Sequence, residues 1–359
     1  TGPHERVYLS WLEPTGDTAH ALRFATLTGD QWSAPRTITQ GSRFFVNWAD
    51  FPSIVVAPDN RLAAHWLQRS DTARYAYGVR VAQSFDGGAS WSQPITPHRD
   101  GSATEHGFVS LFAVRDSLGA VWLDGRNFAG AGENSRPSMM LMTTTVASDG
   151  STGAERVLDE RVCDCCQTSI AVAASGPVVV YRDRSLNEIR DISIIRWTDS
   201  GWTRPIPVHS DQWKIDHCPV NGPAVAADGE HVAVAWFTSS GDSGRVLLAQ
   251  SDDGGATFAA PVRIDDGNPV GRVDVVTHRT GLVVSWMEFT SERQAEVRVR
   301  PVSRSGQLGE STVIARSSGE RASGFPHIAV SRGYLIIAWT EAGSPPRVRV
   351  ARTQLDPAD

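Results

Sequence analysis

The feature that most constrains this chain is a repeat of short apolar runs with a period of 50 to 59 residues. Each repeat opens with a run rich in β-branched residues, and a second run follows, often with a central aromatic residue, as at 63–66 and 233–236. Gly, Pro, Asp and Ser separate the runs, and helical periodicity is almost absent. The pattern therefore indicates an all-β chain built from one repeated unit. The six aligned starting positions are Ser53, Ser110, Ser169, Pro223, Val273 and His327.

A repeat of four strands at this period is typical of a β-propeller blade. The runs at 7–11, 20–26 and 32–38 are expected to supply strands two to four of a further unit, and the last unit ends after its third run, at 347–351. We therefore predict an all-β fold with seven four-stranded antiparallel blades, and six blades as the alternative. No linker or change in composition interrupts the repeat, so a single domain over residues 1–359 is expected.

The charged residues are dispersed, and the net charge is −6 with a pI near 5.9. This distribution lacks the basic footprint of a protein that binds nucleic acid or an anionic membrane. No run of about 18 apolar residues occurs, so no membrane span is predicted. The sequence opens at Thr1 without an apolar signal region, as in a mature exported protein, and a periplasmic or secreted location is expected. Oligomeric state stays open.

Two turns carry a resemblance to a known superfamily. Residues 84–91 read Ser-Phe-Asp-Gly-Gly-Ala-Ser-Trp and residues 251–258 read Ser-Asp-Asp-Gly-Gly-Ala-Thr-Phe. Both match the Asp-box pattern, in which Asp binds turn amides and Gly accepts positive φ. The chain thus resembles the sialidase-like (BNR) propellers. It is most similar to a bacterial exo-sialidase-like group that shares the motifs at 47–52, 105–110, 163–168, 181–185 and 218–223.

The resemblance implies an active site, but the catalytic residues of sialidases are not carried over to positions of this chain. Sialidases of this superfamily use an arginine triad for the substrate carboxylate, a Tyr nucleophile paired with Glu, an Asp acid/base, and an Arg-Ile-Pro motif in the first blade. This chain instead reads Asn-Trp-Ala-Asp-Phe-Pro at 47–52. Of its five tyrosines, Tyr181 is the one that lies within a cluster of charged residues in the sequence.

All four cysteines lie in two short motifs, with Cys163, Cys165 and Cys166 in one and Cys218 in the other. Thiolates select copper(I), zinc or iron–sulfur clusters, whereas an oxidising compartment favours disulfides. A Cys165–Cys166 bridge would be strained, because neighbouring Cα atoms lie about 3.8 Å apart and ordinary disulfides span about 4.4–6.8 Å. Other pairings remain possible, and the spacing is unlike that of zinc ribbons.

In a propeller, the residues before each first strand and after each second strand open onto one mouth of the channel. We therefore expect Cys218 to face Cys165 and Cys166. The predicted metal ligands are Cys163, Cys165, Cys166, Cys218, His106 and His217. Copper is the expected metal, with zinc or no metal as alternatives.

The same mouth gathers the candidate residues for catalysis and substrate binding, and a small-molecule or glycan ligand is expected there. Glycoside hydrolysis needs two carboxyls about 5–9.5 Å apart, and several acidic side chains fall in the expected region. The catalytic candidates are Asp50, Asp124, Tyr181, Arg182, Asp183 and Glu288. The substrate-binding candidates are Arg126, Arg184, Arg190 and Arg272.

Three functions follow from these patterns. The leading hypothesis is an exported propeller whose copper site serves redox chemistry or metal handling. The alternative is a sialidase-like glycoside hydrolase or carbohydrate-binding propeller in which disulfides brace the mouth. A non-catalytic interaction scaffold is the third, and it predicts neither metal nor turnover.

Overall fold

The computed structural model describes residues 1–2, 5–114, 117–132, 135–279, 281–291 and 293–355. The chain divides into two compact units, Thr1–Asp164 and Cys165–Asp359. Regular structure in the described residues consists of antiparallel strands and three short 3-10 helices, η2 (Arg126–Phe128), η3 (Ser240–Asp242) and η4 (Arg321–Ser323). Among these residues, no helix has the length and apolar character needed to cross a bilayer.

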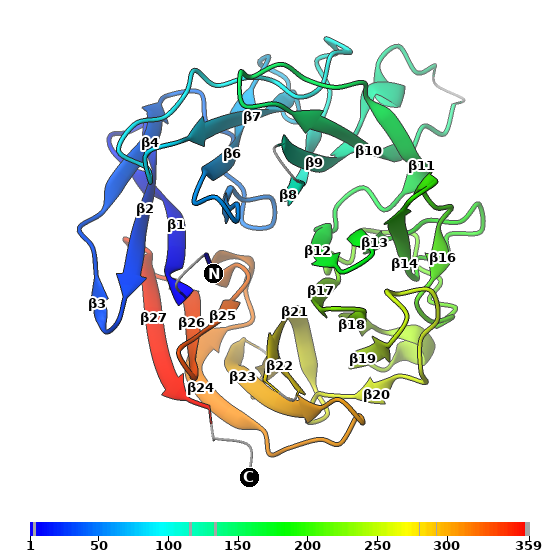
Figure 1. The fold of residues 1–359 in the computed structure, drawn as a ribbon. Helices are drawn as coiled ribbons and strands as arrows, with labels where there is room; N and C mark the ends of the chain where they lie inside the picture. Colours follow the sequence, from blue (N-terminus) through cyan, green and yellow to red (C-terminus); the bar gives the residue numbers. More distant parts are fainter. Residues whose placement is uncertain (3–4, 115–116, 133–134, 280, 292, 356–359) are drawn as a thin grey trace. The chain divides into compact units, whose positions relative to one another are not determined.

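The first unit, Thr1–Asp164, contains three sheets (Figure 1). The first has β1 (Val7–Pro14), β2 (His20–Thr28), β3 (Gln31–Trp32) and β4 (Arg36–Gly41). The second has β5 (Ser53–Val56), β6 (Leu62–Arg69) and β7 (Tyr77–Ser84). The third has β8 (His106–Val114), β9 (Ser117–Asp124), β10 (Met139–Val146) and β11 (Arg156–Val162).

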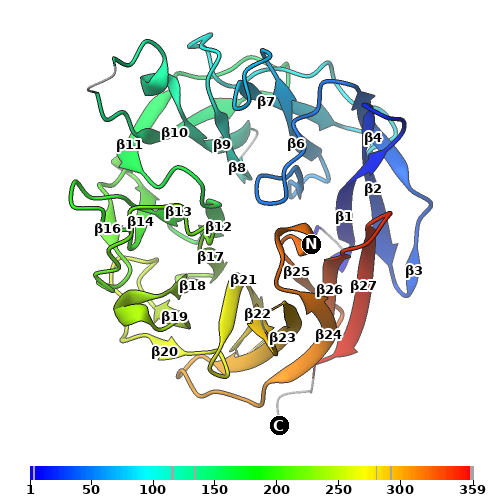
Figure 2. The ribbon, with the colours of Figure 1, turned by 180° about the vertical axis from the view of Figure 1, so that it is seen from behind.

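The second unit, Cys165–Asp359, contains four sheets. They comprise β12 (Ser169–Ala173), β13 (Gly176–Arg182), β14 (Ile192–Thr198), β15 (Gly201–Trp202) and β16 (Ile206–Pro207); β17 (Ala224–Asp228), β18 (His231–Thr238), β19 (Arg245–Ser251) and β20 (Val262–Arg263); β21 (Pro269–His278), β22 (Gly281–Phe289), β23 (Gln294–Ser303) and β24 (Thr312–Ser318); and β25 (His327–Ser331), β26 (Tyr334–Glu341) and β27 (Arg347–Gln354). Within this unit β12 contacts β17, and β17 contacts β21, as both views show (Figures 1 and 2).

These seven sheets are the blades of a β-propeller, so the predicted fold class and the blade number are confirmed. The blades have three to five strands each, whereas four strands were expected in every blade. In the second blade the run expected at 91–95 is reduced to one bridge between Val81 and Ile95. Pro94 lies inside that run and has no N–H to extend a ladder. The last blade ends with its third strand, as predicted.

Aromatic residues of the second strands fill the space between neighbouring sheets of one unit. Trp122 on β9 packs with Tyr77 and Val79 of the preceding sheet, and Trp236 on β18 packs with Val180 of β13. Both indoles are almost fully buried. This agrees with the packing expected of large aromatic side chains between blades.

The two Asp-boxes form the turns that their sequences predict. Asp86 accepts hydrogen bonds from the Ser90 amide (2.9 Å) and from the Ser84 hydroxyl (2.8 Å). Asp253 accepts the same bonds from the Thr257 amide (2.9 Å) and the Ser251 hydroxyl (2.7 Å). The hydrogen bond from the Ser90 hydroxyl is the largest of several that hold the pKa of Asp86 below its usual range. These carboxylates therefore close turns.

Candidate functional site

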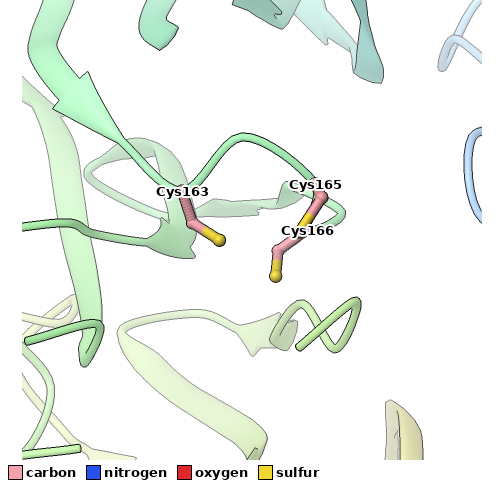
Figure 3. Close-up of side chains that lie close together, drawn as sticks. All are labelled: Cys163, Cys165 and Cys166. Atoms are coloured by element: carbon pink, nitrogen blue, oxygen red, sulfur yellow. The ribbon is translucent and has the colours of Figure 1, made fainter. Parts of the chain in front are cut away.

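The segment that follows β11 brings three thiols together (Figure 3). The sulfur atoms of Cys163, Cys165 and Cys166 all lie within 4.8 Å of one another. Cys163 and Cys166 are buried, whereas Cys165 is partly exposed. The structure contains these residues as thiols, and the group could hold a metal ion. We call these three residues the thiol cluster.

The other predicted metal ligands lie outside this cluster. Cys218 and His217 are exposed, and the His217 ring contacts the Asp216 carboxylate at 3.1 Å. His106 is buried, and both of its ring nitrogens are engaged. Its Nδ1 lies 3.2 Å from the Thr104 carbonyl oxygen, and its Nε2 lies 3.0 Å from Asp100 Oδ1.

A second cluster lies wholly in the first unit and joins three side chains from different sheets or loops. The Oη atom of Tyr77, at the start of β7, lies 2.8 Å from Asp50 Oδ2 and 2.6 Å from Glu105 Oε1. Asp50 and Tyr77 are buried, whereas Glu105 is partly exposed. We call Asp50, Tyr77 and Glu105 the phenol cluster.

Local structure fixes the position of Asp50. The Asn47 side-chain oxygen accepts hydrogen bonds from the amides of Ala49 (2.8 Å) and Asp50 (3.3 Å), which closes a turn before β5. Asp50 Oδ1 accepts the Phe108 amide at 2.8 Å. Phe108 has a φ of 52°, which is strained for an aromatic residue and turns this amide toward the carboxylate.

Burial sets the protonation of the phenol cluster. It raises the pKa of Asp50 to about 7, against the opposing effect of the Phe108 amide. It also raises the pKa of Glu105 to about 7, and the nearby Asp164 carboxylate adds to this rise. Burial, followed by the charges of the two carboxyls, holds the pKa of the Tyr77 phenol well above its ordinary value. The cluster therefore titrates near neutral pH through its carboxyls.

An aromatic stack connects the phenol cluster with a surface hollow. The Phe45 ring lies parallel to Tyr77, with centroids 3.8 Å apart, and the Arg69 guanidinium lies over Phe45 at 5.2 Å. Arg69 and Arg43 also line a hollow of about 640 Å³ together with Ser70 and Asp71. Arginine side chains suit planar, anionic groups such as carboxylates. The two guanidinium groups thus offer contacts to an acidic ligand group beside the Asp71 carboxylate.

An ion-pair network lies in the sheet that contains β8, the strand that follows Glu105. Asp124, predicted as a catalytic carboxylate, is buried and accepts hydrogen bonds from the Arg126 guanidinium (2.7 and 2.8 Å) and the Trp122 indole (2.8 Å). Arg126, predicted to bind substrate, also contacts Glu155 at 2.7 Å. Burial alone would lower the pKa of His106, but its contacts with the aspartates of this network raise it overall. Asp124 and Arg126 thus form an ion pair with each other.

The predicted residues of β13 and the loop after it form an interior network in the second unit. Arg182 is buried and donates to the carbonyl oxygens of Asn221 (2.8 and 3.0 Å) and Arg190 (2.6 Å). Arg184 and Arg190 each contact Glu188 at 2.9 Å. Guanidinium groups bound in this way stabilise the loop.

The remaining predicted residues of the second unit are also buried or engaged in local contacts. Tyr181 is buried, and Asp183 accepts the Ser193 hydroxyl at 3.2 Å. The Arg272 guanidinium donates to the Ser323 hydroxyl and to backbone carbonyls, and burial lowers its pKa to about 10. Glu288 is buried and accepts the Trp286 indole at 2.6 Å.

Gly107 permits the close approach within the phenol cluster. A Cβ at this position would lie 2.0 Å from Asp50 Oδ2 and 2.9 Å from the Tyr77 ring. We predict that Gly107→Ala destabilises the fold by about 1–3 kcal/mol, since overpacking must displace a buried carboxyl. Gly41→Ala is the matched control, because a Cβ there meets nothing within 4 Å. Urea denaturation measures both, and equal midpoints for the two variants would contradict the assigned packing.

Comparison with protein-family models and with curated proteins found no match to the sequence. Comparison with solved structures did find similar folds. A Hadza microbial sialidase is 13% identical with a TM-score of 0.55, covering 95% of this chain and 74% of its own. The intramolecular trans-sialidase from Ruminococcus gnavus is 11% identical with a TM-score of 0.54, covering 87% and 97%. The GH93 α-L-arabinofuranosidase of Fusarium graminearum is 13% identical with a TM-score of 0.55, covering 85% and 92%. The chain therefore has a sialidase-like β-propeller fold.

Proposed function

We propose that this protein is a glycoside hydrolase of the sialidase-like propeller fold, acting at the phenol cluster. The observation that supports this most strongly is the contact of one phenol with two carboxyls, at 2.8 Å to Asp50 and 2.6 Å to Glu105. Glycoside hydrolysis needs a carboxyl that still carries a proton near neutral pH. Glu105 has the raised pKa and the partial exposure that this role requires.

Glu105 acts as the general acid in this proposal. It protonates the oxygen of the leaving group while the glycosidic C–O bond breaks, and it then accepts a proton from the attacking water. Tyr77 is buried, so its phenol is placed to orient Glu105 rather than to attack the sugar. The proposal therefore keeps the Tyr–Glu contact of sialidases but gives it a different task.

An acidic glycan is the proposed substrate class. Arg43 and Arg69 line the hollow next to the aromatic stack on Tyr77, and their two guanidinium groups outnumber the one carboxylate that lines it, Asp71. Similar folds act on such ligands, since one solved relative is an ulvan lyase bound to a glucuronic-acid glycan. We propose a periplasmic or secreted location for this protein.

The direct test uses the purified protein with paired aryl glycosides that carry either an acidic or a neutral sugar. We expect release of the aryl alcohol from the acidic member of a pair, with a much smaller rate for the neutral member. Turnover should persist in the presence of a chelator. Failure to cleave any acidic glycoside over the acid-to-neutral range would contradict the proposal.

A second candidate function rests on the thiol cluster. A metal bonded to three sulfurs at about 2.3 Å needs them roughly 4 Å apart, and these sulfurs lie within 4.8 Å. Three thiolates suit copper(I) better than calcium or magnesium. We infer a copper(I)-binding role in metal handling, with zinc as the competing ion. Elemental analysis and a thiol count on anaerobically purified protein test this role.

A further inference from the structure

Asp50 makes a contact that recurs in the second unit without a carboxylate. Asp50 Oδ1 accepts the amide of Phe108, whose φ is 52°. In the same way Asn221 Oδ1 accepts the amide of Arg272 at 2.7 Å, and Arg272 has a φ of 54°. A glycine precedes the strained residue in both places, and the ladder of the strand shifts its register there. An amide oxygen thus suffices for this contact.

The second oxygen of Asp50 therefore calls for a separate explanation. A carboxylate placed in a buried site is costly unless it is paired with a cation or protonated. Oδ2 contacts the Tyr77 phenol, which has one proton but lies within hydrogen-bond distance of two carboxyl oxygens. A single proton cannot be donated in both directions. Both hydrogen bonds form only when one of the two carboxyls is itself protonated.

We propose that Asp50 is a buried proton store that recharges Glu105 through the phenol of Tyr77. The proposal rests on the hydrolase function of the phenol cluster. Asp50 is buried and Glu105 is partly exposed, so a proton stored at Asp50 reaches a ligand by way of Tyr77. Asp50 is thus a positioning and proton-storing residue, and Glu105 is the group that touches substrate.

The proton balance closes with water as the only co-reactant. Glu105 gives its proton to the leaving oxygen as the glycosidic C–O bond breaks. The phenol then gives its proton to Glu105 and takes the proton of Asp50, which becomes a carboxylate. As water forms the new C–O bond it gives a proton to Glu105, Glu105 passes the proton that it holds to Tyr77, and Tyr77 passes its own proton to Asp50. One water is consumed, and the cluster recovers its initial protonation.

The charged groups around the cluster are compatible with one retained proton. Asp164 faces Glu105 and opposes its ionisation, whereas the charge of His106 favours it. Around Asp50, the Phe108 amide and the Tyr77 hydroxyl favour the carboxylate, and Glu105 opposes it. Burial outweighs these contacts for both carboxyls, and both pKa values rise to about 7.

The decisive variant is Asp50→Asn, because Asn221 makes the equivalent backbone contact with an amide. In isotope-edited infrared spectra of labelled Asp, the wild type should show a protonated carboxyl at neutral pH, and Asp50→Asn should lack it. On an acidic aryl glycoside, kcat should fall on the order of tenfold with KM unchanged, less than the loss expected for a general acid. The limb of the pH profile that reports Glu105 should move to lower pH.

Tyr77→Phe is the second test variant, because it removes the hydroxyl that passes the proton from Asp50 to Glu105 and leaves Asp50 in place. We expect a comparable fall in kcat together with retention of the Asp50 acid band. The proton store is refuted if the wild type has no protonated Asp carboxyl near neutral pH, or if the Asp50→Asn pH profile matches that of the wild type. Wild-type protein that shows the infrared band but cleaves no glycoside would refute the hydrolase function instead.

Discussion

Glu105→Gln should lower kcat for an acidic aryl glycoside by about 100- to 10,000-fold, the usual effect of losing a general acid. Glutamine retains the shape of the side chain and can still accept the Tyr77 hydroxyl, which lies 2.6 Å from Glu105. The variant therefore keeps the phenol in place and removes only the transferable proton. KM should change little, because Arg43 and Arg69 still line the hollow.

A matched control is available in the sheet that contains β8, the strand that follows Glu105. Glu160 is an exposed residue of β11, and Glu160→Gln makes the same chemical change outside the phenol cluster. It should leave kcat and the pH profile unaltered. A substrate with a very good leaving group needs little protonation, so the Glu105→Gln defect should shrink on it. A defect of equal size on all leaving groups would argue against the acid role of Glu105.

The strands of the fold were predictable because every blade repeats the same local pattern. The start of β5 at Ser53 and of β12 at Ser169 agrees with the aligned repeat. Two of the predicted catalytic carboxylates take part in a contact that their local pattern indicates. In Trp122-x-Asp124 and Trp286-x-Glu288 the two residues lie on one face of a strand, and the indole donates to the carboxylate. That spacing indicates a structural contact.

Tyr77 could have been found by extending the same reasoning to the third strand. The third strand of a blade runs parallel to the first, so its beginning lies at the same edge of the sheet. Tyr77 begins β7, and it forms a parallel bridge with Glu105 before the next blade. The positions of Asp50 and His106 in the repeat placed both near the mouth of the channel. The distances within the phenol cluster were not predictable, because they depend on the packing of one sheet against another.

The position of His106 follows from the repeat, whereas its contacts do not. His106 does lie at the start of a first strand, as the repeat requires. Its ring, however, is stacked on His98 with centroids 3.9 Å apart, and its nitrogens bind Thr104 and Asp100. His98 comes from the loop after β7, whose course has no repeat in the sequence. The repeat therefore predicts the position of His106, whereas the contacts of its ring depend on the irregular loop that carries His98.

The second large effect is expected at the thiol cluster. Anaerobically purified protein should bind one equivalent of copper(I), and Cys165→Ser or Cys166→Ser should weaken binding by at least about 100-fold, more than the loss of an outer-shell contact. Each substitution removes one of three soft ligands whose sulfurs lie within 4.8 Å of one another. Competition with a chromogenic copper(I) chelator measures the affinity, and thiolate-to-copper absorption reports the ligand type.

Cys218→Ser decides between three and four cysteine ligands. Cys218 is exposed and lies outside the thiol cluster, so the structure favours unchanged copper affinity in this variant, whereas the repeat in the sequence favours a loss. Hydrolysis by Cys165→Ser should equal that of the wild type, and Glu105→Gln should bind copper normally. Copper binding that survives replacement of all three clustered cysteines would eliminate the metal site while leaving the hydrolase proposal intact. The hydrolase proposal and the copper proposal can therefore be tested independently of each other.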